Sequence, residues 1–455
     1  MAARKGPSFF RGAWIPAALI AILVPRPAAY ADEPGALMIS GAAILDPVAE
    51  KLIEGSTVVI VGGRIVEVSA SPKVVEGAQR IDWSGLTLLP GLIDLHSHLL
   101  LHPYNEAAWD DQVLKESLEL RTVRAVAAAK ATLEAGFTTL RDLGTEGAGF
   151  ADVALRDAIA QGIIPGPRVY ATTRAIVATG CYGPSGFDPR WDVPKGAQVA
   201  DGVDGVRKAV REQIAAGADW IKVYADYRRR AGDPATPTFS HDELNALVAE
   251  ARSANVPVAA HAFTAEAIRR AVLAGVLTIE HGFDATEEVL LLMRERGVVL
   301  CPTLAADEAM ARYSGWQPGQ PEPTRVRQTR EMFQRALRSG VTIACGSDVG
   351  VFPHGENLRE LELMAEYGMP VANVLRSATT TAAKVLGREN DLGRIAPGFG
   401  ADVIAVRGNP LENLKVLEHP VVVIKEGKIV VNRFGIDRLD RRDPPLPPQP
   451  IRPNP

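Results

Sequence analysis

The sequence predicts an α/β protein: a (β/α)8 TIM barrel with a small β-sandwich formed from both chain ends. Between residues 89 and 388, short apolar segments alternate with amphipathic helices, which is the pattern of repeated βαβ units. The flanking regions, 36–88 and 389–435, contain short strand patterns separated by turns. A doubly wound open sheet is the alternative, but no glycine-rich phosphate turn follows the first strand. The barrel is therefore the favoured architecture.

The two flanking regions resemble each other in pattern. In the first, the apolar segment 58–61 leads through Gly62-Gly63 into the alternating segment 64–68, which is typical of a hairpin. In the second, strand patterns cover 401–406, 421–424 and 429–431, with a turn at 426–428. We expect both regions to form one small sheet domain.

Eight apolar segments of the central region are predicted as barrel strands. Helical patterns separate them, for example at 116–135, 205–216, 241–254 and 326–339. The predicted strands are Thr87–Leu95, Thr138–Leu143, Arg168–Thr172, Trp220–Tyr224, Val256–Ala260, Leu277–Glu280, Val298–Leu304 and Thr342–Gly346.

The N-terminus has the three parts of a secretory signal peptide. A basic start (Arg4, Lys5, Arg11) precedes the apolar segment 13–24 and an Ala29-Tyr30-Ala31 cleavage site. The apolar segment is too short for the alternative, a membrane anchor. We expect cleavage after Ala31, export to the periplasm or medium, and no membrane association afterwards. Residues 441–455 form a proline-rich tail that cannot pack.

The composition excludes some partners. The chain is 47% hydrophobic and 23% charged, as in ordinary globular proteins. Removal of residues 1–31, which carry four basic residues and no acidic one, takes the formal charge from −4 to −8. This balance predicts neither nucleic acid nor an anionic membrane as a partner. Cys181, Cys301 and Cys345 are odd in number, and the sequence does not decide whether two of them pair.

Six potential metal ligands lie at the expected C-terminal ends of the barrel strands. In such barrels the catalytic groups gather at this end. Two histidines of the first strand, separated by one residue, point to the same side, and neutral imidazoles are common metal ligands. The six are His96 and His98 on strand 1, Lys222 on strand 4, His261 on strand 5, His281 on strand 6 and Asp348 after strand 8.

This ligand pattern resembles that of the amidohydrolase superfamily in its binuclear, metal-dependent branch. Pro90-Gly91-Leu92-Ile93-Asp94 before His96 and the C-terminal Gly393–Asp402 segment also match the family. The resemblance implies a Lys222 carboxylated by CO2 to a carbamate that bridges two divalent metal ions, most simply Zn²⁺. The alternative is a structural lysine paired with Asp219 or Asp226.

The resemblance also implies the reaction, which is metal-assisted hydrolysis of an amide. A water bridging two zinc ions is hydroxide at neutral pH and attacks the carbonyl carbon, while Asp348 passes its proton to the leaving nitrogen. A mononuclear deaminase is disfavoured, because Lys222 is present and Thr264 stands where that branch has Glu. A cyclic-amide or lactone hydrolase and a non-catalytic metal-binding or ligand-binding barrel are further alternatives.

The family resemblance extends to a subgroup of exported Xaa-Pro dipeptidases, carboxypeptidases, imidazolonepropionases and ochratoxin hydrolases. We therefore expect a small molecule or short peptide as substrate, release of a C-terminal amino acid, and a homo-oligomer. Ochratoxin-type aryl amides of phenylalanine are included. Close relatives carry Gly-His-Gly in the loop after strand 3, where this chain has Cys181-Tyr182-Gly183.

Substrate contacts are expected from loops at the barrel mouth. Tyr224 faces the same side as Lys222 and is a candidate catalytic and substrate-binding residue, or else packs the mouth. Arg228, in the run 228–230, is a candidate carboxylate ligand or part of a solvated face. His354 and Asn357 are candidate substrate contacts, although Asn357 is equally placed to cap the next helix. Arg141-Asp142 are expected to brace the barrel, and His102 and His241 to lie outside the metal site.

Overall fold

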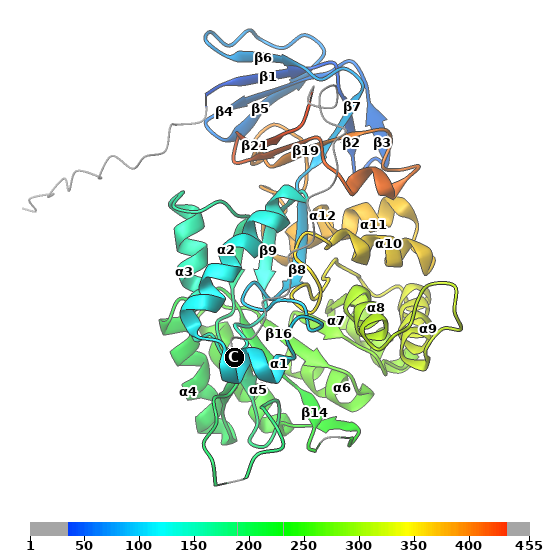
Figure 1. Ribbon diagram of the computed structural model, residues 1–455. Helices are drawn as coiled ribbons and strands as arrows, with labels where there is room; N and C mark the ends of the chain where they lie inside the picture. Colours follow the sequence, from blue (N-terminus) through cyan, green and yellow to red (C-terminus); the bar gives the residue numbers. More distant parts are fainter. Residues whose placement is uncertain (1–34, 189, 231, 435–455) are drawn as a thin grey trace, which may run out of the picture. The chain divides into compact units, whose positions relative to one another are not determined.

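Two small sheets contain the strands from the two ends of the chain (Figure 1): the first is built from residues 37–82 alone, and the second combines strands from both ends. The computed structural model describes residues 35–188, 190–230 and 232–434. The sheets have the strand orders β5-β4-β1-β6 and β21-β20-β19-β7-β2-β3, and their apolar residues share one hydrophobic cluster. The predicted hairpin is confirmed, since β4 and β5 pair antiparallel around Gly62-Gly63. The strands are β1 (Leu37–Ser40), β2 (Ala43–Asp46), β3 (Lys51–Ile53), β4 (Thr57–Val61), β5 (Arg64–Ser69), β6 (Gln79–Asp82), β7 (Leu86–Pro90), β19 (Val403–Arg407), β20 (Val422–Lys425) and β21 (Lys428–Asn432).

The central region contains parallel strands with helices between them. One sheet has the order β10-β9-β8 and the other β12-β11-β13-β16-β17-β18. Every residue of β8, β9 and β16 is buried, as expected for parallel strands that are covered on both faces. They are β8 (Leu92–Ser97), β9 (Phe137–Asp142), β10 (Arg168–Ala171), β11 (Ile176–Val177), β12 (Gln198–Val199), β13 (Ile221–Tyr224), β16 (Val258–Ala262), β17 (Thr278–His281) and β18 (Val299–Cys301), and a separate hairpin joins β14 (Asp226–Arg228) to β15 (Ala235–Pro237).

Backbone hydrogen bonds connect the two central sheets. On one side, the amides of Asp219 and Trp220 donate to the Ala171 carbonyl. On the other side, the Leu95 amide donates to Cys345 and the Leu300 amide donates to Thr342. In the described residues these bonds do not form one continuous ladder, so the closed barrel stays a prediction. The predicted eighth strand, 342–346, has only a single bridge, between Ile343 and Leu300.

Two predicted strand boundaries were wrong. The segment Thr87–Leu95 is not one strand: β7 pairs with β19, whereas β8 pairs with β9. The break falls at Gly91, where a Cβ would lie 2.2 Å from Thr138 Oγ1. The predicted seventh strand, Val298–Leu304, ends at Cys301, and Leu304 is the first residue of a helix.

The helices agree with the predicted segments to within a few residues. Several begin at a hydroxyl side chain, such as Ser240, which forms a capping box with Glu243. They are α1 (Trp109–Lys115), α2 (Leu118–Glu134), α3 (Ala151–Ala160), α4 (Gly202–Ala215), α5 (His241–Ser253), α6 (Ala265–Ala274), α7 (Glu287–Arg296), α8 (Leu304–Tyr313), α9 (Thr324–Ser339), α10 (Leu358–Glu366), α11 (Val371–Ser377), α12 (Thr380–Val385) and the 3-10 helix η1 (Leu414–Leu417).

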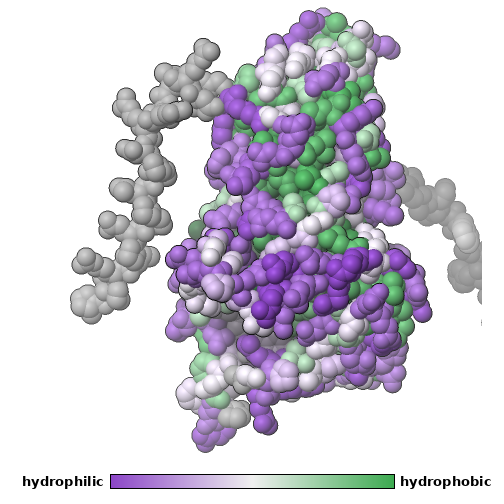
Figure 2. Space-filling model, turned by 90° about the vertical axis from the view of Figure 1, so that its right-hand side faces the viewer, coloured by the Kyte–Doolittle hydropathy of each residue, from purple (hydrophilic) through white to green (hydrophobic). Residues whose placement is uncertain are grey.

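The predicted signal peptide (1–31) and proline-rich tail (441–455) lie outside the described residues. Among the described helices, none combines the length and apolar character that crossing a membrane requires. On the face drawn in Figure 2, a band of strongly hydrophilic side chains crosses the surface, and apolar side chains are exposed above it.

Candidate metal centre

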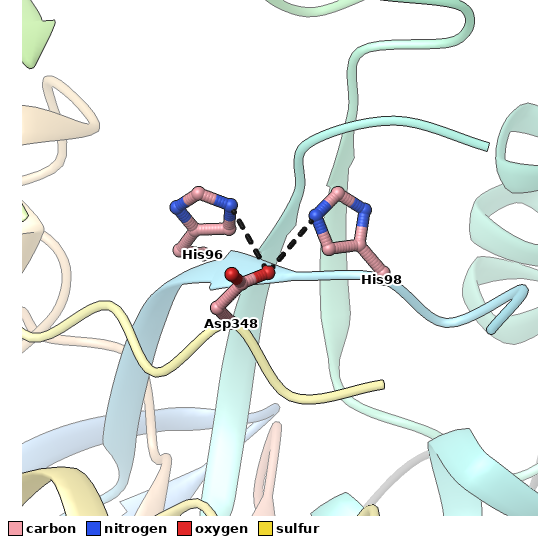
Figure 3. A group of neighbouring side chains, drawn as sticks. All are labelled: His96, His98 and Asp348. Carbon is pink, nitrogen blue, oxygen red and sulfur yellow. Dashed lines mark ion pairs between the residues drawn. The ribbon is translucent and has the colours of Figure 1, made fainter. Parts of the chain in front are cut away.

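Three side chains meet at the end of β8 and form a group that can hold a metal ion (Figure 3). One ligand atom each from His96, His98 and Asp348 lies within 4.8 Å of the others. Asp348 Oδ1 is 3.4 Å from His96 Nε2 and 3.2 Å from His98 Nε2. Two imidazoles and a carboxylate are suitable ligands for a divalent transition metal.

The backbone around Asp348 fixes the positions of His96, His98 and Asp348 relative to one another. Asp348 has a left-handed conformation, with φ of 63°, which is uncommon for a residue other than glycine. Its amide donates to the His96 carbonyl, and the His98 amide donates to Val349. The buried Asp94 carboxylate accepts from the amides of His96 and Ser347 and thereby ties the same two segments together. Such strain and bonding are typical of a preorganised site.

Both histidines have a second partner that orients the ring. Glu280 Oε2 lies 2.9 Å from His96 Nδ1, and the Gly144 carbonyl lies 3.0 Å from His98 Nδ1. In both rings this leaves Nε2 directed at Asp348, as expected for histidines that bind a metal through one nitrogen and a protein acceptor through the other. Burial raises the pKa of Glu280, but the Arg141 guanidinium at 2.9 Å and His96 outweigh it and hold the pKa at about 2.

Lys222 lies in β13 and is almost completely buried. Its Nζ has no hydrogen-bond partner among the described residues, and it is 5.6 Å from the centre of the Tyr224 ring. Burial lowers the pKa of this amine. The alternative pairings are not present: Asp219 accepts from Arg156, and Asp226 accepts from the amides of residues 263 and 264.

His261 and His281 complete the predicted set. Their ring centres are 4.6 Å apart, and the centre of the His281 ring is 5.1 Å from that of His96. His261 stacks on Tyr224, and its Nε2 lies 3.8 Å from the Asp226 carboxylate. His281 has φ of 73° and contacts the Thr303 hydroxyl through Nδ1 at 2.8 Å. Burial lowers the pKa of both imidazoles well below the usual value, which keeps them neutral and able to bind metal.

These side chains open into one cavity of about 470 Å³. Five of the six predicted ligands line it, and the buried Lys222 does not. Aromatic side chains supply much of the remaining wall, and cations stand at two places on the rim. The lining includes Tyr104, Trp109, Tyr182, Tyr224, Tyr227, Phe263, Phe283, Arg228 and Arg325.

Comparison with known proteins agrees with this geometry. The Amidohydrolase family matches residues 87–430. The chain belongs to the amidohydrolase family. It is a hydrolase that acts on carbon–nitrogen bonds.

Several relatives are close enough to be compared over most of this amidohydrolase. Ochratoxinase from Aspergillus niger is 33% identical over 375 residues, which are 75% of each chain. A crystal structure described as a Xaa-Pro dipeptidase with bound methionine is 34% identical, with a TM-score of 0.79 over 88% of this chain and 100% of that one. A prolidase complexed with N-methylphosphonate-L-proline is 35% identical, with a TM-score of 0.76 over 87% and 100%.

Two predicted substrate contacts of this amidohydrolase lie elsewhere. Asn357 is fully buried and donates through Nδ2 to Asp94 at 2.8 Å, so it braces the segment before His96 and does not line the cavity. Nor does its side chain cap α10. His354 directs Nε2 to the Leu101 carbonyl at 3.2 Å and is also absent from the cavity lining. By contrast, Tyr224 and Arg228 do line it.

Arg141, His102 and His241, which were predicted to lie outside the metal-ligand set, lie as expected. Arg141 donates to the Leu95 carbonyl and to Glu280, which confirms that it braces the strands. His102 contacts Glu106 and Glu116 outside the metal group. His241 starts α5, beside the capping residue Ser240.

Sequence reasoning missed two carboxylates close to the histidines. Glu280 directly precedes His281, and an acidic residue inside an apolar strand was the available signal. Glu146, in the turn after β9, is 1% exposed and lies 3.7 Å from His98 Nδ1. Glu146 also accepts from Trp109 Nε1 at 2.9 Å and from the Tyr182 hydroxyl. No local pattern marks Glu146, because its partners come from distant segments.

Proposed function

We propose that this amidohydrolase is a binuclear, metal-dependent enzyme that releases a C-terminal amino acid from dipeptides or N-acyl amino acids. The buried Lys222 amine carries the proposal, because a charged, unpaired ammonium in this position would be strongly disfavoured. A neutral amine can instead attack CO2, forming a nitrogen–carbon bond and releasing one proton. The resulting carbamate would be an anionic ligand among the histidines.

The donor set fits two divalent ions. His96, His98 and Asp348 would hold one ion, His261 and His281 would hold the other, and carboxylated Lys222 would belong to both. Zn²⁺ is the ion that this mixture of nitrogen and oxygen ligands suits best. When bound, such ions make water more acidic and polarise a carbonyl group.

The protein's own side chains then have separate roles. Asp348 is the general base, which accepts a proton on Oδ and returns it to the leaving nitrogen. Tyr224 lies in the cavity wall beside His261, which supports its proposed role as the donor of a hydrogen bond to a substrate oxygen. Arg228 at the rim is the proposed ligand of the substrate carboxylate. Glu280 and Arg141 position His96.

The architecture and location follow from the same proposal. We propose that the two central sheets close into a (β/α)8 barrel (89–388) and that the two terminal sheets (36–88 with 389–435) form a β-sandwich. Export after cleavage at Ala31 would place the enzyme where peptides are scavenged, and a homo-oligomer is proposed. The names of the relatives support peptides and ochratoxin-type amides as substrates.

Metal content and a substrate panel test the proposal together. The purified protein should contain about two zinc ions per chain by elemental analysis. Dipeptides and N-acyl amino acids should be cleaved, and their C-terminal amides should be cleaved far more slowly, because Arg228 would lose its carboxylate partner. Equal cleavage of cyclic amides or lactones that lack a carboxylate would contradict the substrate assignment. A protein with fewer than one metal ion that still turns over would contradict the metal assignment.

A further inference from the structure

A second, smaller cavity adjoins the catalytic cavity. It has a volume of about 260 Å³ and lies between the loop of residues 180–199 and the start of the β14–β15 hairpin. The two cavities share part of their walls, including Trp109, Tyr182, Tyr227 and Arg228. A substrate bound at the metal centre could therefore extend into the smaller cavity. We call it the basic side pocket, after Lys195, Arg228, Arg229 and Arg230 in its wall.

The charge of the basic side pocket is unbalanced. Its wall contains those four cations and one acid, Asp110. Among the described residues none of the four forms an ion pair, and Arg229 makes only a 3.4 Å hydrogen bond to the Pro237 carbonyl. This local excess of positive charge stands out in a chain with a formal charge of −4. Such a pocket attracts anions.

The end of the catalytic cavity that is not shared with the basic side pocket is different. There Phe263, Phe283 and Met310, none of which lines the basic side pocket, contribute apolar surface. The cation at that end, Arg325, is already satisfied: it donates to Asp307 at 3.0 Å, and its guanidinium carbon lies 3.2 Å from the centre of the Phe283 ring. The cavity therefore has an apolar end with a neutralised arginine and an end that leads to unpaired cations.

From this asymmetry we infer that the enzyme selects substrates whose leaving amino acid has an acidic side chain, with an apolar group on the acyl side. The inference rests on the proposed function. The α-carboxylate would engage Arg228 where the two cavities meet. The side-chain carboxylate of aspartate or glutamate would then lie in the basic side pocket, near Lys195, Arg229 and Arg230. Dipeptides and N-acyl amino acids that end in Glu or Asp are the substrate class.

A matched peptide panel tests this preference. Leu-Glu and Leu-Gln differ only in the charge of the leaving residue, and Leu-Lys reverses that charge. At low ionic strength kcat/KM for Leu-Glu should exceed that for Leu-Gln by about tenfold, which is the scale of a few partly exposed charge interactions. The ratio should fall as salt is added. A ratio near one, or a preference for Leu-Lys, would overturn the inference.

Variants assign the preference to the pocket. Arg229→Gln combined with Arg230→Gln should bring the Leu-Glu to Leu-Gln ratio close to one, and Lys195→Gln should lower it by a smaller factor. The control combines Arg207→Gln and Arg338→Gln, which remove the same charge from exposed helix positions outside both cavities, and should keep the ratio. If the Arg229/Arg230 variant keeps the wild-type ratio of Leu-Glu to Leu-Gln, the assignment of the preference to the basic side pocket is wrong.

A binding measurement separates this inference from the proposed function. Free L-glutamate should raise the thermal midpoint of the wild-type protein more than L-glutamine does, and the difference should vanish in the Arg229/Arg230 variant. If no peptide is cleaved but this difference is present, the proposed reaction fails and the acidic-ligand pocket stands. If Leu-Gln is cleaved and glutamate has no advantage in either assay, the reaction stands and the pocket assignment fails.

Discussion

The two halves of the proposed metal centre differ in how many of their polar side-chain atoms have a partner within the protein. In the half formed by His96, His98 and Asp348, the side chains contact one another, and each imidazole has an acceptor at its second nitrogen. In the other half, formed by His261, His281 and the lysine that both ions would share, the Lys222 amine is buried and has no hydrogen-bond partner among the described residues. The first half is therefore preorganised by the fold, whereas the second requires a further chemical component to be stable.

Removing the amine of the second half should have the largest effect. Lys222→Ala eliminates the site of carboxylation, so both ions lose the anionic ligand that they would share. We expect metal content to fall to about one ion per chain or less, and kcat/KM to fall by at least about 10³-fold, the scale of a lost charge-stabilising group. Elemental analysis and steady-state kinetics provide the measurement.

A small acid should partly restore the Lys222→Ala variant if a carbamate is the missing group. Acetate or propionate can occupy the space of the lost side chain and supply a carboxylate, so added acid should raise both metal content and turnover. Lys208→Ala, on the exposed face of α4, is the matched control and should behave as wild type. Full activity of Lys222→Ala without added acid would refute the carbamate.

In the first half, Asp348 can be changed so that its charge is lost while the size of its side chain is kept. Asp348→Asn keeps the size of the side chain and its contacts with both histidines but cannot accept a proton at neutral pH. We expect kcat to fall by about 10²–10⁴-fold, as for loss of a general base, with a much smaller change in KM. Similar losses in kcat and in the affinity for a product amino acid would instead indicate a purely structural role for Asp348.

Whether the sequence could predict a residue's role depends on whether that role follows from local spacing or from distant contacts. The six candidate ligands follow from strand ends and from the family resemblance, because both depend on local spacing along the chain. The roles of Glu280, Glu146 and Asn357 depend on contacts between segments far apart in sequence, such as the 263-residue separation between Asn357 and Asp94. Such pairings have no local signature, so the sequence predicts Asn357 as a substrate contact or a helix cap and not as a partner of Asp94.

The predicted boundaries of the strands in residues 87–95 were wrong for a related reason. The run 87–95 is apolar throughout, and periodicity cannot divide such a run between two sheets. The different partners of β7 and β8, and the close approach of Thr138 to Gly91 between them, show where the run divides. Seven of the eight predicted segments overlap strands of the structure, because the alternation of strands and helices persists along the chain. The eighth, 342–346, has only the bridge between Ile343 and Leu300, and the short strands β11, β12, β14 and β15 were not predicted.

Substitution of Glu280 tests how His96, in the first half, is held in position. Glu280→Gln leaves Arg141 buried without its anionic partner, and we expect the metal-free protein to lose about 3 kcal/mol of stability in denaturant unfolding. The pKa of Glu280 is about 2 in the folded protein and 4.5 ordinarily, so its stabilising contribution is complete above about pH 4.5 and disappears as the pH falls toward 2. The stability of the variant should accordingly change less than that of wild type over this interval. Equal slopes would mean that the Arg141–Glu280 pair does not form.

The smallest effect should come from Asn357, and it distinguishes bracing from substrate binding. Asn357→Ala removes one hydrogen bond to the buried Asp94 carboxylate, which keeps its bonds from the amides of His96 and Ser347 and from the Ser347 hydroxyl. We expect a loss of about 2 kcal/mol in unfolding free energy, the scale of a buried hydrogen bond to a charged group. KM should stay within about twofold of wild type, because Asn357 does not line the cavity. Arg228→Gln is the counterpart: it should raise KM for substrates with a free carboxylate while leaving stability nearly unchanged, since its side chain is exposed and forms no ion pair in the described residues. If Asn357→Ala raised KM without lowering stability, Asn357 would belong to the substrate site, and the compact bracing of the first half would rest on Asp94 and Ser347 alone.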